Sequence, residues 1–186
     1  MYKFHYDTLK PEFGQDMKLA YMVTDSFVIA LKGENIIDKL KKISSEMDES
    51  YLPDDHPLHS NANKDIIGKF KYEYKKNAFC IISHVALRSK TYCQRLIVDK
   101  KVEDKMKGKG TVKAALSDTV TYENYKNVIL NKKDGELIKQ ERFSSRKLKI
   151  YTVEEMKEGL KLYDDKNFIA DDYNTCRPIG HYRNQI

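Results

Sequence analysis

One stretch near the N-terminus, KLAYMVTDSFVIAL, limits most sharply what this sequence can fold into. Its two apolar runs are separated only by Thr24, Asp25 and Ser26, residues that commonly form turns. This spacing predicts a β-hairpin with strands at Met17–Val23 and 27–31 and a carboxylate at its tip. The residues alone leave two interpretations of Asp25 open: it is a turn residue, or it is part of a metal site.

Helical and extended patterns alternate along the rest of the chain. Apolar residues at helical spacing predict helices, and period-two alternation or short apolar runs predict strands. The predicted helices cover 2–13, 33–48, 117–130 and about 152–162. Thr121 is the predicted N-cap of the third, and the capping-box sequence Thr152-Val153-Glu154-Glu155 begins the fourth. The predicted strands cover 67–74, one or two segments of 78–99, 136–140, 148–152 and one segment of the tail, while 49–65 reads as a polar loop.

These elements predict an α+β fold. We expect an antiparallel sheet of about four strands with helices on one face, followed by a smaller mixed lobe. Gly108 and Gly110 mark the clearest boundary, which places one domain at 1–108 and a second at 109–186. With 186 residues, the chain is long enough to bury a substantial core.

Charge and composition narrow the classes of function. The 34 Lys and Arg residues exceed the 28 Asp and Glu residues, and the resulting net charge of +6 suits a polyanionic partner. Two basic segments that we expect to be flexible, 101–110 and 144–149, concentrate this charge, although solvated surface lysines remain the alternative. The chain contains no apolar run of about 18 residues and no signal-peptide pattern, so we expect a soluble intracellular protein, nuclear or cytoplasmic, without a membrane partner. Cys80, Cys93 and Cys176 lack C-x-x-C spacing and are expected to be reduced.

Four stretches together resemble family B DNA polymerases. Residues 21–26 resemble the Y-x-D-T-D-S hairpin of that family, and Lys90 and Tyr92 within ALRSKTY match its K-x-Y element near the palm–thumb junction. IGKFKYEY and TVTYENYKNVIL resemble further stretches of the protein-primed branch, especially the polinton (Maverick) polymerases of mobile elements and related viral or plasmid enzymes. The order and spacing of all four agree with that branch, and they span nearly the whole chain.

The resemblance implies that 1–108 is the C-terminal part of a polymerase palm and that 109–186 is a thumb-like subdomain and tail. In that family the palm hairpin holds Mg²⁺ for template-directed transfer of deoxynucleotides, because two metal ions clamp the attacking and leaving oxygens. The resemblance therefore gives Asp25 a catalytic and metal-binding role. It places five further residues against primer–template DNA: Thr24, Ser26, Arg88, Lys90 and Tyr92.

Strand alternation gives a separate argument for the K-x-Y element. If Lys90 and Tyr92 lie on one strand, they share a face, with Arg88 beside them. A cation and a phenol hydroxyl side by side can then contact successive phosphates without reading the base sequence. The alternative is an ordinary basic strand with an aromatic neighbour.

The chain departs from the family's pattern at the metal site. Val23 stands where the family has its first Asp, and a valine side chain offers no lone pair to a cation. We also find no stretch resembling D-x-x-S-L-Y-P or K-x-x-x-N-S-x-Y-G, and no proofreading exonuclease. We therefore expect a DNA-contacting, catalytically impaired polymerase piece in which Asp25 binds Mg²⁺ weakly or not at all. Two alternatives remain: a non-catalytic DNA-binding scaffold, and a chain that docks with the missing polymerase part or a terminal protein.

Overall fold

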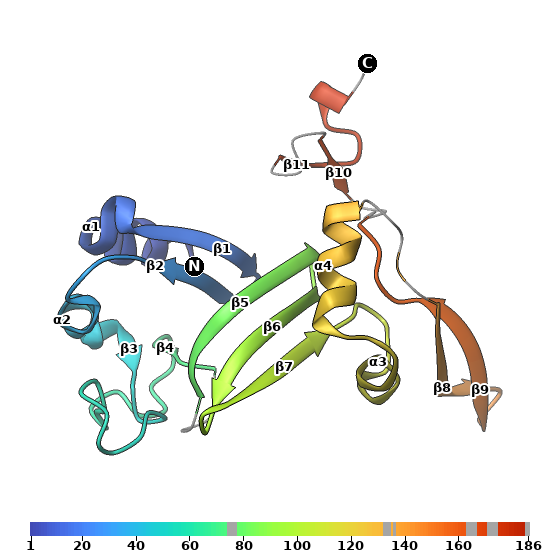
Figure 1. The fold of residues 1–186 in the computed structure, drawn as a ribbon, viewed down its shortest axis with the longest axis horizontal. Helices are drawn as coiled ribbons and strands as arrows, with labels where there is room; N and C mark the ends of the chain where they lie inside the picture. The colour runs from blue at the N-terminus through green and yellow to red at the C-terminus, as the bar shows by residue number, and fades with distance from the viewer. Residues whose placement is uncertain (74–77, 132–134, 136, 163–166, 171–174, 185–186) are drawn as a thin grey trace. The chain divides into compact units, whose positions relative to one another are not determined.

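The computed structural model describes residues 1–186 apart from 74–77, 132–134, 136, 163–166, 171–174 and 185–186 (Figure 1). The chain divides into two compact units. Unit 1 comprises Met1–Cys80 and Ile97–Val102, and unit 2 comprises Ile81–Leu96 and Glu103–Ile186. The assignment of 1–108 to a palm and 109–186 to a thumb stays a prediction.

Unit 1 packs an N-terminal helical segment against the predicted hairpin. Its elements are a π-helical turn (Phe4–Leu9), α1 (Lys10–Phe13), a 3₁₀ turn (Gly14–Asp16), β1 (Met17–Val23), β2 (Ser26–Leu31), α2 (Ile36–Lys42), a 3₁₀ turn (Ser44–Glu46), β3 (Met47–Asp48) and β4 (Phe70–Lys71). Phe4, Leu9 and Phe13 form its core together with Ile43. The ring of Phe4 stacks on that of Phe70 with 4.0 Å between centroids. The predicted N-terminal helix and hairpin are confirmed, whereas the helix predicted at 33–48 is confirmed only over Ile36–Lys42, since Met47–Asp48 form β3.

The strand predicted at 67–74 is wrong for most of its described length. Only Phe70–Lys71 are extended and paired, in parallel with β3. Gly68 has a φ of +92° and the preceding Ile67 is fully exposed, so the chain turns where alternation suggested a strand. Of the apolar residues in this segment, Phe70 packs against the core cluster of unit 1. Tyr74 lies outside the described residues.

Unit 2 contains most of a three-stranded sheet, helices and two hairpins. Its elements are β5 (Ala78–Arg88), β6 (Thr91–Val98) and β7 (Lys101–Lys107), paired in that order, α3 (Lys113–Thr119), α4 (Tyr122–Asn131), β8 (Leu137–Arg146), β9 (Lys149–Glu158), β10 (Asn167–Ile169), β11 (Cys176–Pro178) and a 3₁₀ turn (Tyr182–Asn184). The cap of α4 is confirmed, because the Thr121 backbone N–H donates to Asn124 Oδ1 at 2.8 Å and the Asn124 N–H donates to Thr121 Oγ1 at 3.4 Å. The core includes Leu116, Tyr125 and Ile138.

Two local predictions in unit 2 are wrong. The basic segments 101–110 and 144–149 are predicted to be flexible, but most of the first forms β7, and the second forms the end of β8, the hairpin turn and the start of β9. The helix expected at 152–162 is the strand β9, which pairs with β8 over its full length, with Thr152 opposite Phe143 and Glu155 opposite Gln140. A continuous ladder of backbone hydrogen bonds outweighs one capping-box spelling.

The mixed α+β class is confirmed, but the strands form several small sheets instead of one sheet of about four. In the described residues, β1–β2, β8–β9 and β10–β11 are antiparallel pairs, β3–β4 is a parallel pair, and β5–β6–β7 is a separate sheet. Short connections favour pairing between consecutive strands. None of the helices in the described part of the chain is long and apolar enough to cross a membrane.

The tip of the β8–β9 hairpin carries backbone strain that substitution should relieve. Lys147 and Leu148 form its two-residue turn with φ values of +48° and +63°, a conformation that favours Asn-Gly. Replacing the pair by Asn-Gly should raise the free energy of unfolding by about 1 kcal/mol, measured by urea denaturation. The same replacement at Thr24–Asp25, where neither φ is positive, is the control and should bring no gain. Lower stability of the Lys147→Asn, Leu148→Gly variant would contradict the prediction.

Candidate nucleic-acid interface

The tip of the β1–β2 hairpin carries the predicted metal ligand. Val23 pairs with Ser26, so Thr24 and Asp25 form the turn between the strands. Thr24 and Asp25 are exposed, whereas Ser26 is half-buried at the start of β2. The hairpin thus presents one carboxylate and one hydroxyl to solvent at its tip.

The residues at this tip do not form a two-metal site. In the part of the chain that the structure describes, no three His, Cys, Asp or Glu side chains gather closely enough to hold a metal ion. Asp25 supplies a single carboxylate, and the position two residues before it is the aliphatic Val23. Two-metal nucleotidyl transfer requires oxygen ligands that bridge and flank ions about 4 Å apart. The donor set therefore does not fit the catalytic metals that the resemblance implies.

The K-x-Y element lies at the turn between β5 and β6. Arg88 ends β5, Ser89 and Lys90 form the turn, and Tyr92 is the second residue of β6. Lys90 is exposed and has a φ of +61°, so it is not part of a strand. The prediction that Lys90 and Tyr92 share one strand face is wrong, because the chain reverses direction at Lys90.

The end of β7 brings a further lysine to this turn. The Lys109 backbone N–H donates to the Thr91 hydroxyl at 3.2 Å, and the hydroxyl of the buried Tyr125 donates to the Lys107 carbonyl at 2.9 Å. The first contact holds the end of β7 next to the start of β6, and the second ties it to α4. The backbones of Arg88, Lys90 and Lys109 therefore lie at the same end of the sheet.

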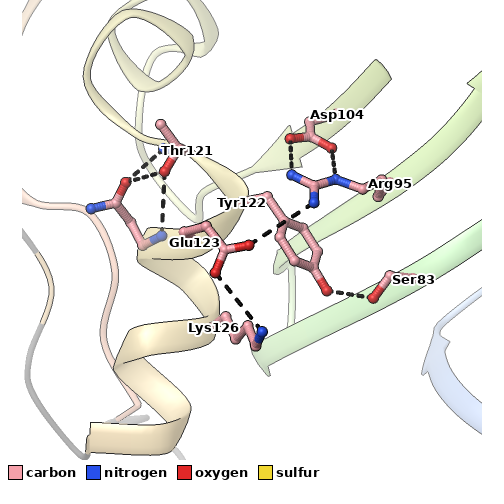
Figure 2. A network of polar contacts seen from close by, with 8 residues as sticks. Ser83, Arg95, Asp104, Thr121, Tyr122, Glu123 and Lys126 are labelled. Carbon is pink, nitrogen blue, oxygen red and sulfur yellow. Dashed lines mark hydrogen bonds and ion pairs between the residues drawn. The ribbon is translucent and has the colours of Figure 1, made fainter. Parts of the chain in front are cut away.

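Tyr92 lies on the sheet face opposite to the one that α4 covers. The Arg95 guanidinium lies 4.0 Å from the centroid of the Tyr122 ring of α4 and binds both oxygens of Asp104, at 2.8 and 3.0 Å (Figure 2). Because side chains alternate along β6, Tyr92 points away from α4. Its ring lies 5.6 Å from that of His84, whose pKa is lowered by burial, so the neighbouring imidazole is neutral at physiological pH.

Sequence reasoning missed the polar network that holds α4 against the sheet. Besides the contacts of Arg95, the network includes a hydrogen bond between the hydroxyls of Ser83 and Tyr122 and an ion pair of Glu123 with Lys126 at 3.9 Å (Figure 2). The hydrogen bond of Asp104 raises the pKa of the Arg95 guanidinium still further. Glu123 and Lys126 are i,i+3 neighbours within α4, but no spacing in the sequence connects the helix with its partners on the strands, Ser83 and Arg95. The network keeps α4 on one face of the β5–β6–β7 sheet. It thereby stabilises the strand β6, whose opposite face carries Tyr92.

Cys80 and Cys93 are free thiols. Cys80 is exposed, and Cys93 is buried in the core of unit 2. Burial, together with the nearby charge of Asp104, raises the pKa of Cys93 to about 12. Cys93 is therefore a protonated core residue at neutral pH and not a nucleophile.

Comparison with protein-family models, with curated proteins and with solved structures finds no match to this chain. The polymerase resemblance therefore rests on its four sequence motifs. Residues of two of these motifs, Asp25 and Lys90, lie in exposed hairpin turns.

Proposed function

We propose that this chain contacts the backbone of primer–template DNA as the palm-and-thumb part of a protein-primed family B DNA polymerase. The observation that carries the proposal is the gathering of Arg88, Lys90 and Lys109 at one end of the β5–β6–β7 sheet, with Tyr92 close to the same turn. Cations and a phenol hydroxyl in this arrangement suit phosphate contacts that position a nucleic acid without reading its sequence. The K-x-Y resemblance assigns the same residues to DNA.

In this proposal the chain is catalytically impaired as it stands. Its parent activity is template-directed addition of deoxynucleotides to a primer, with Mg²⁺ as the metal. Asp25 is the one carboxylate at the hairpin tip, and Val23 stands at the position where the family has its first Asp. Thr24 and Ser26 flank Asp25 at the hairpin tip, and in the parent enzyme their hydroxyls would contact the primer end.

Salt-dependent binding tests the DNA contact. We expect the chain to bind a labelled primer–template, and Lys90→Ala to reduce the slope of log affinity against log salt by about 0.9, the contribution of one phosphate contact. Lys100→Ala is the matched control, because Lys100 is also exposed with a positive φ of +65°, in the turn between β6 and β7. Fluorescence anisotropy over a salt series measures both variants. Tyr92→Ala should weaken binding further.

Comparison of the salt slopes of the Lys90→Ala and Lys100→Ala variants separates a specific contact from general charge. Equal slopes for Lys90→Ala and Lys100→Ala would mean that general surface charge binds the DNA. Absence of any binding to primer–template, single-stranded or duplex DNA at low salt would overturn the proposal.

A non-catalytic DNA-binding scaffold is the second candidate, and Val23 is the residue that favours it. Both candidates bind DNA, but only a polymerase piece can contribute to synthesis. Primer extension by the Val23→Asp variant, mixed with an exonuclease-and-fingers part from a protein-primed polymerase, separates them. Nucleotide incorporation would support the polymerase piece, and its absence together with intact DNA binding would support the scaffold.

A further inference from the structure

The distal half of the β8–β9 hairpin is strongly basic. Residues 142–153 contain four cationic side chains and no Asp or Glu. The base of the hairpin is anchored by the buried Gln140, whose Oε1 accepts from the Val112 N–H at 2.8 Å and whose Nε2 donates to Glu155 at 2.7 Å. Beyond this anchor most side chains are exposed, so the charge faces solvent.

The pairing of β8 with β9 separates two chemically different faces. Ser144 lies opposite Tyr151, and Arg146 lies opposite Lys149, so the aromatic ring and the cations share one face. The other face carries apolar side chains, of which Phe143 is 79% exposed. In the distal half, the first face is therefore basic with one aromatic ring, and the second carries Phe143 and Ile150 beside the uncharged Ser145 and Thr152. We call the first the basic face.

The basic face is hollowed. Two hollows of about 500 and 740 Å³ lie on it, and both are lined by Arg146 and Tyr151. Lys147 and Lys149 complete the first, and the second is completed by Arg142, Ser144, Thr152, Val153 and Glu154, so it reaches the edge of the hairpin. Tyr151 is 48% exposed, which leaves its side chain available for stacking.

We propose that the basic face of the β8–β9 hairpin binds single-stranded nucleic acid. Arg146, Lys147 and Lys149 contact phosphates, and an unpaired base stacks on Tyr151. Lys149 and Tyr151 are two residues apart on one strand, a distance of about 6.8 Å, so a cation lies one step from the stacked base. Arg142 forms an ion pair with Glu155 at 3.1 Å and is less available for phosphates.

The aromatic ring is what distinguishes this site from a general attraction for polyanions. A duplex offers phosphates to the cations but keeps its bases stacked inside. A single strand offers phosphates together with bases that can stack on tyrosine. The combination of a half-exposed ring and flanking cations therefore favours the single strand.

This inference goes beyond the proposed function, because it concerns a different element and different residues. The Lys90 turn belongs to the β5–β6 hairpin, whereas Tyr151 and Arg146 belong to β8–β9. Either site can fail its test while the other passes.

Anisotropy with a fluorescein-labelled oligo-dT and the full chain tests the proposal. Tyr151→Ala should weaken binding by about 5- to 150-fold, the range for loss of one aromatic–base stack. Phe143→Ala is the matched control, an exposed aromatic on the opposite face of the same hairpin, and should change binding by less than about twofold. Arg146→Ala should weaken binding and lower the salt slope, whereas Lys139→Ala, near the base on the opposite face and ion-paired with Glu154 at 3.0 Å, should not.

Several results would overturn the proposal. They are equal losses for Tyr151→Ala and Phe143→Ala, tighter binding of a blunt duplex than of oligo-dT, or binding to phosphatidylserine vesicles without binding to oligo-dT. Thermal unfolding of each variant confirms that a lost signal reflects the site and not the fold. Lys90→Ala, which belongs to the other test, should leave the effect of Tyr151→Ala unchanged.

Discussion

Replacing Ile138 with alanine is expected to lower the free energy of unfolding by about 2–5 kcal/mol. Ile138 is fully buried in β8, in the core cluster that also contains Leu116, Tyr125 and Leu160. The substitution removes buried apolar surface and leaves a cavity that the surrounding side chains fill only in part. Urea denaturation monitored by circular dichroism measures the change.

Leu137→Ala is the control for this experiment. Leu137 is the preceding residue of β8, is 61% exposed and points to the opposite face, so its truncation should change stability by less than about 0.5 kcal/mol. The pair tests the register of the hairpin, because a slip by one residue would exchange the two faces. A larger loss for Leu137→Ala than for Ile138→Ala would show that the register is wrong.

The same register decides which face of the hairpin meets a ligand. Ile138 and Gln140 lie on the face that also carries Arg146 and Tyr151. This face is buried at the base of the hairpin and basic at its tip. Anchoring of Ile138 in the core therefore fixes the direction in which the proposed nucleic-acid site points.

Features that depend on neighbouring residues were predictable from the sequence. The β1–β2 hairpin follows from two apolar runs around the Thr24–Asp25 turn, and the start of α4 follows from Thr121 three residues before Asn124. In both cases the groups that stabilise the element lie within a few residues of one another. The α+β class follows from such local signals.

Features that depend on distant partners were not predictable. Thr152 and Glu155 spell a helix start, but pairing with β8 makes them part of a strand. Strand alternation through Lys90 ignored the turn, which requires a positive φ that the sequence does not announce with Gly or Asn. The stacking of Arg95 on Tyr122 joins a strand to a later helix, and single-sequence patterns carry no signal for such a pair.

The candidate sites also divide into those that neighbouring residues reveal and those that depend on residues distant in the chain. The Asp25 tip and the basic segment 144–149 were recognised in the sequence, since composition and turn formers mark them. Tyr151 was missed, because its place beside Arg146 and Lys149 exists only once β8 and β9 are paired. A chemical site that spans two strands becomes visible only with their register.

Unit 1 contains a buried carboxyl group that should make stability fall as pH rises. Glu49 is 2% exposed, and its Oε1 has no hydrogen-bond partner among the described residues. Burial raises the pKa of Glu49, although the Ser44 hydroxyl and the charge of His56 act in the opposite direction. Burial and the charge of Glu49 raise the pKa of the nearby Tyr72 to about 12.

The sign of the pH effect follows from proton binding. In the unfolded chain Glu49 loses its proton near the ordinary value of 4.5, whereas in the folded protein it keeps the proton to a higher pH. Between these two values the folded state binds more protons, so the free energy of unfolding decreases as pH rises. Above the folded pKa the full cost of a buried, incompletely paired carboxylate is present.

The adjacent Asp48 has the opposite sign. Burial opposes its ionisation, but hydrogen bonds from the hydroxyl and N–H of Ser50 and from the N–H of Asp65 outweigh burial and lower its pKa. Asp48 therefore stabilises the fold above its unfolded value of 3.8, and this contribution is lost as pH falls through the lowered pKa. Two neighbouring carboxyl groups with similar burial differ because only one is fully hydrogen-bonded.

Glu49→Gln and Asp48→Asn should consequently change stability in opposite directions. At pH 8, Glu49→Gln should raise the free energy of unfolding by about 1–2 kcal/mol and flatten its decline above pH 4.5, because the amide cannot ionise. Asp48→Asn should lower it by about 1–3 kcal/mol, since an amide cannot accept all the hydrogen bonds that the carboxylate accepts. Urea denaturation at a series of pH values from 4 to 8 measures both. A Glu49→Gln variant that is less stable than the parent at pH 8 would mean that the ionised Glu49 is paired in solution and that its burial carries no such cost.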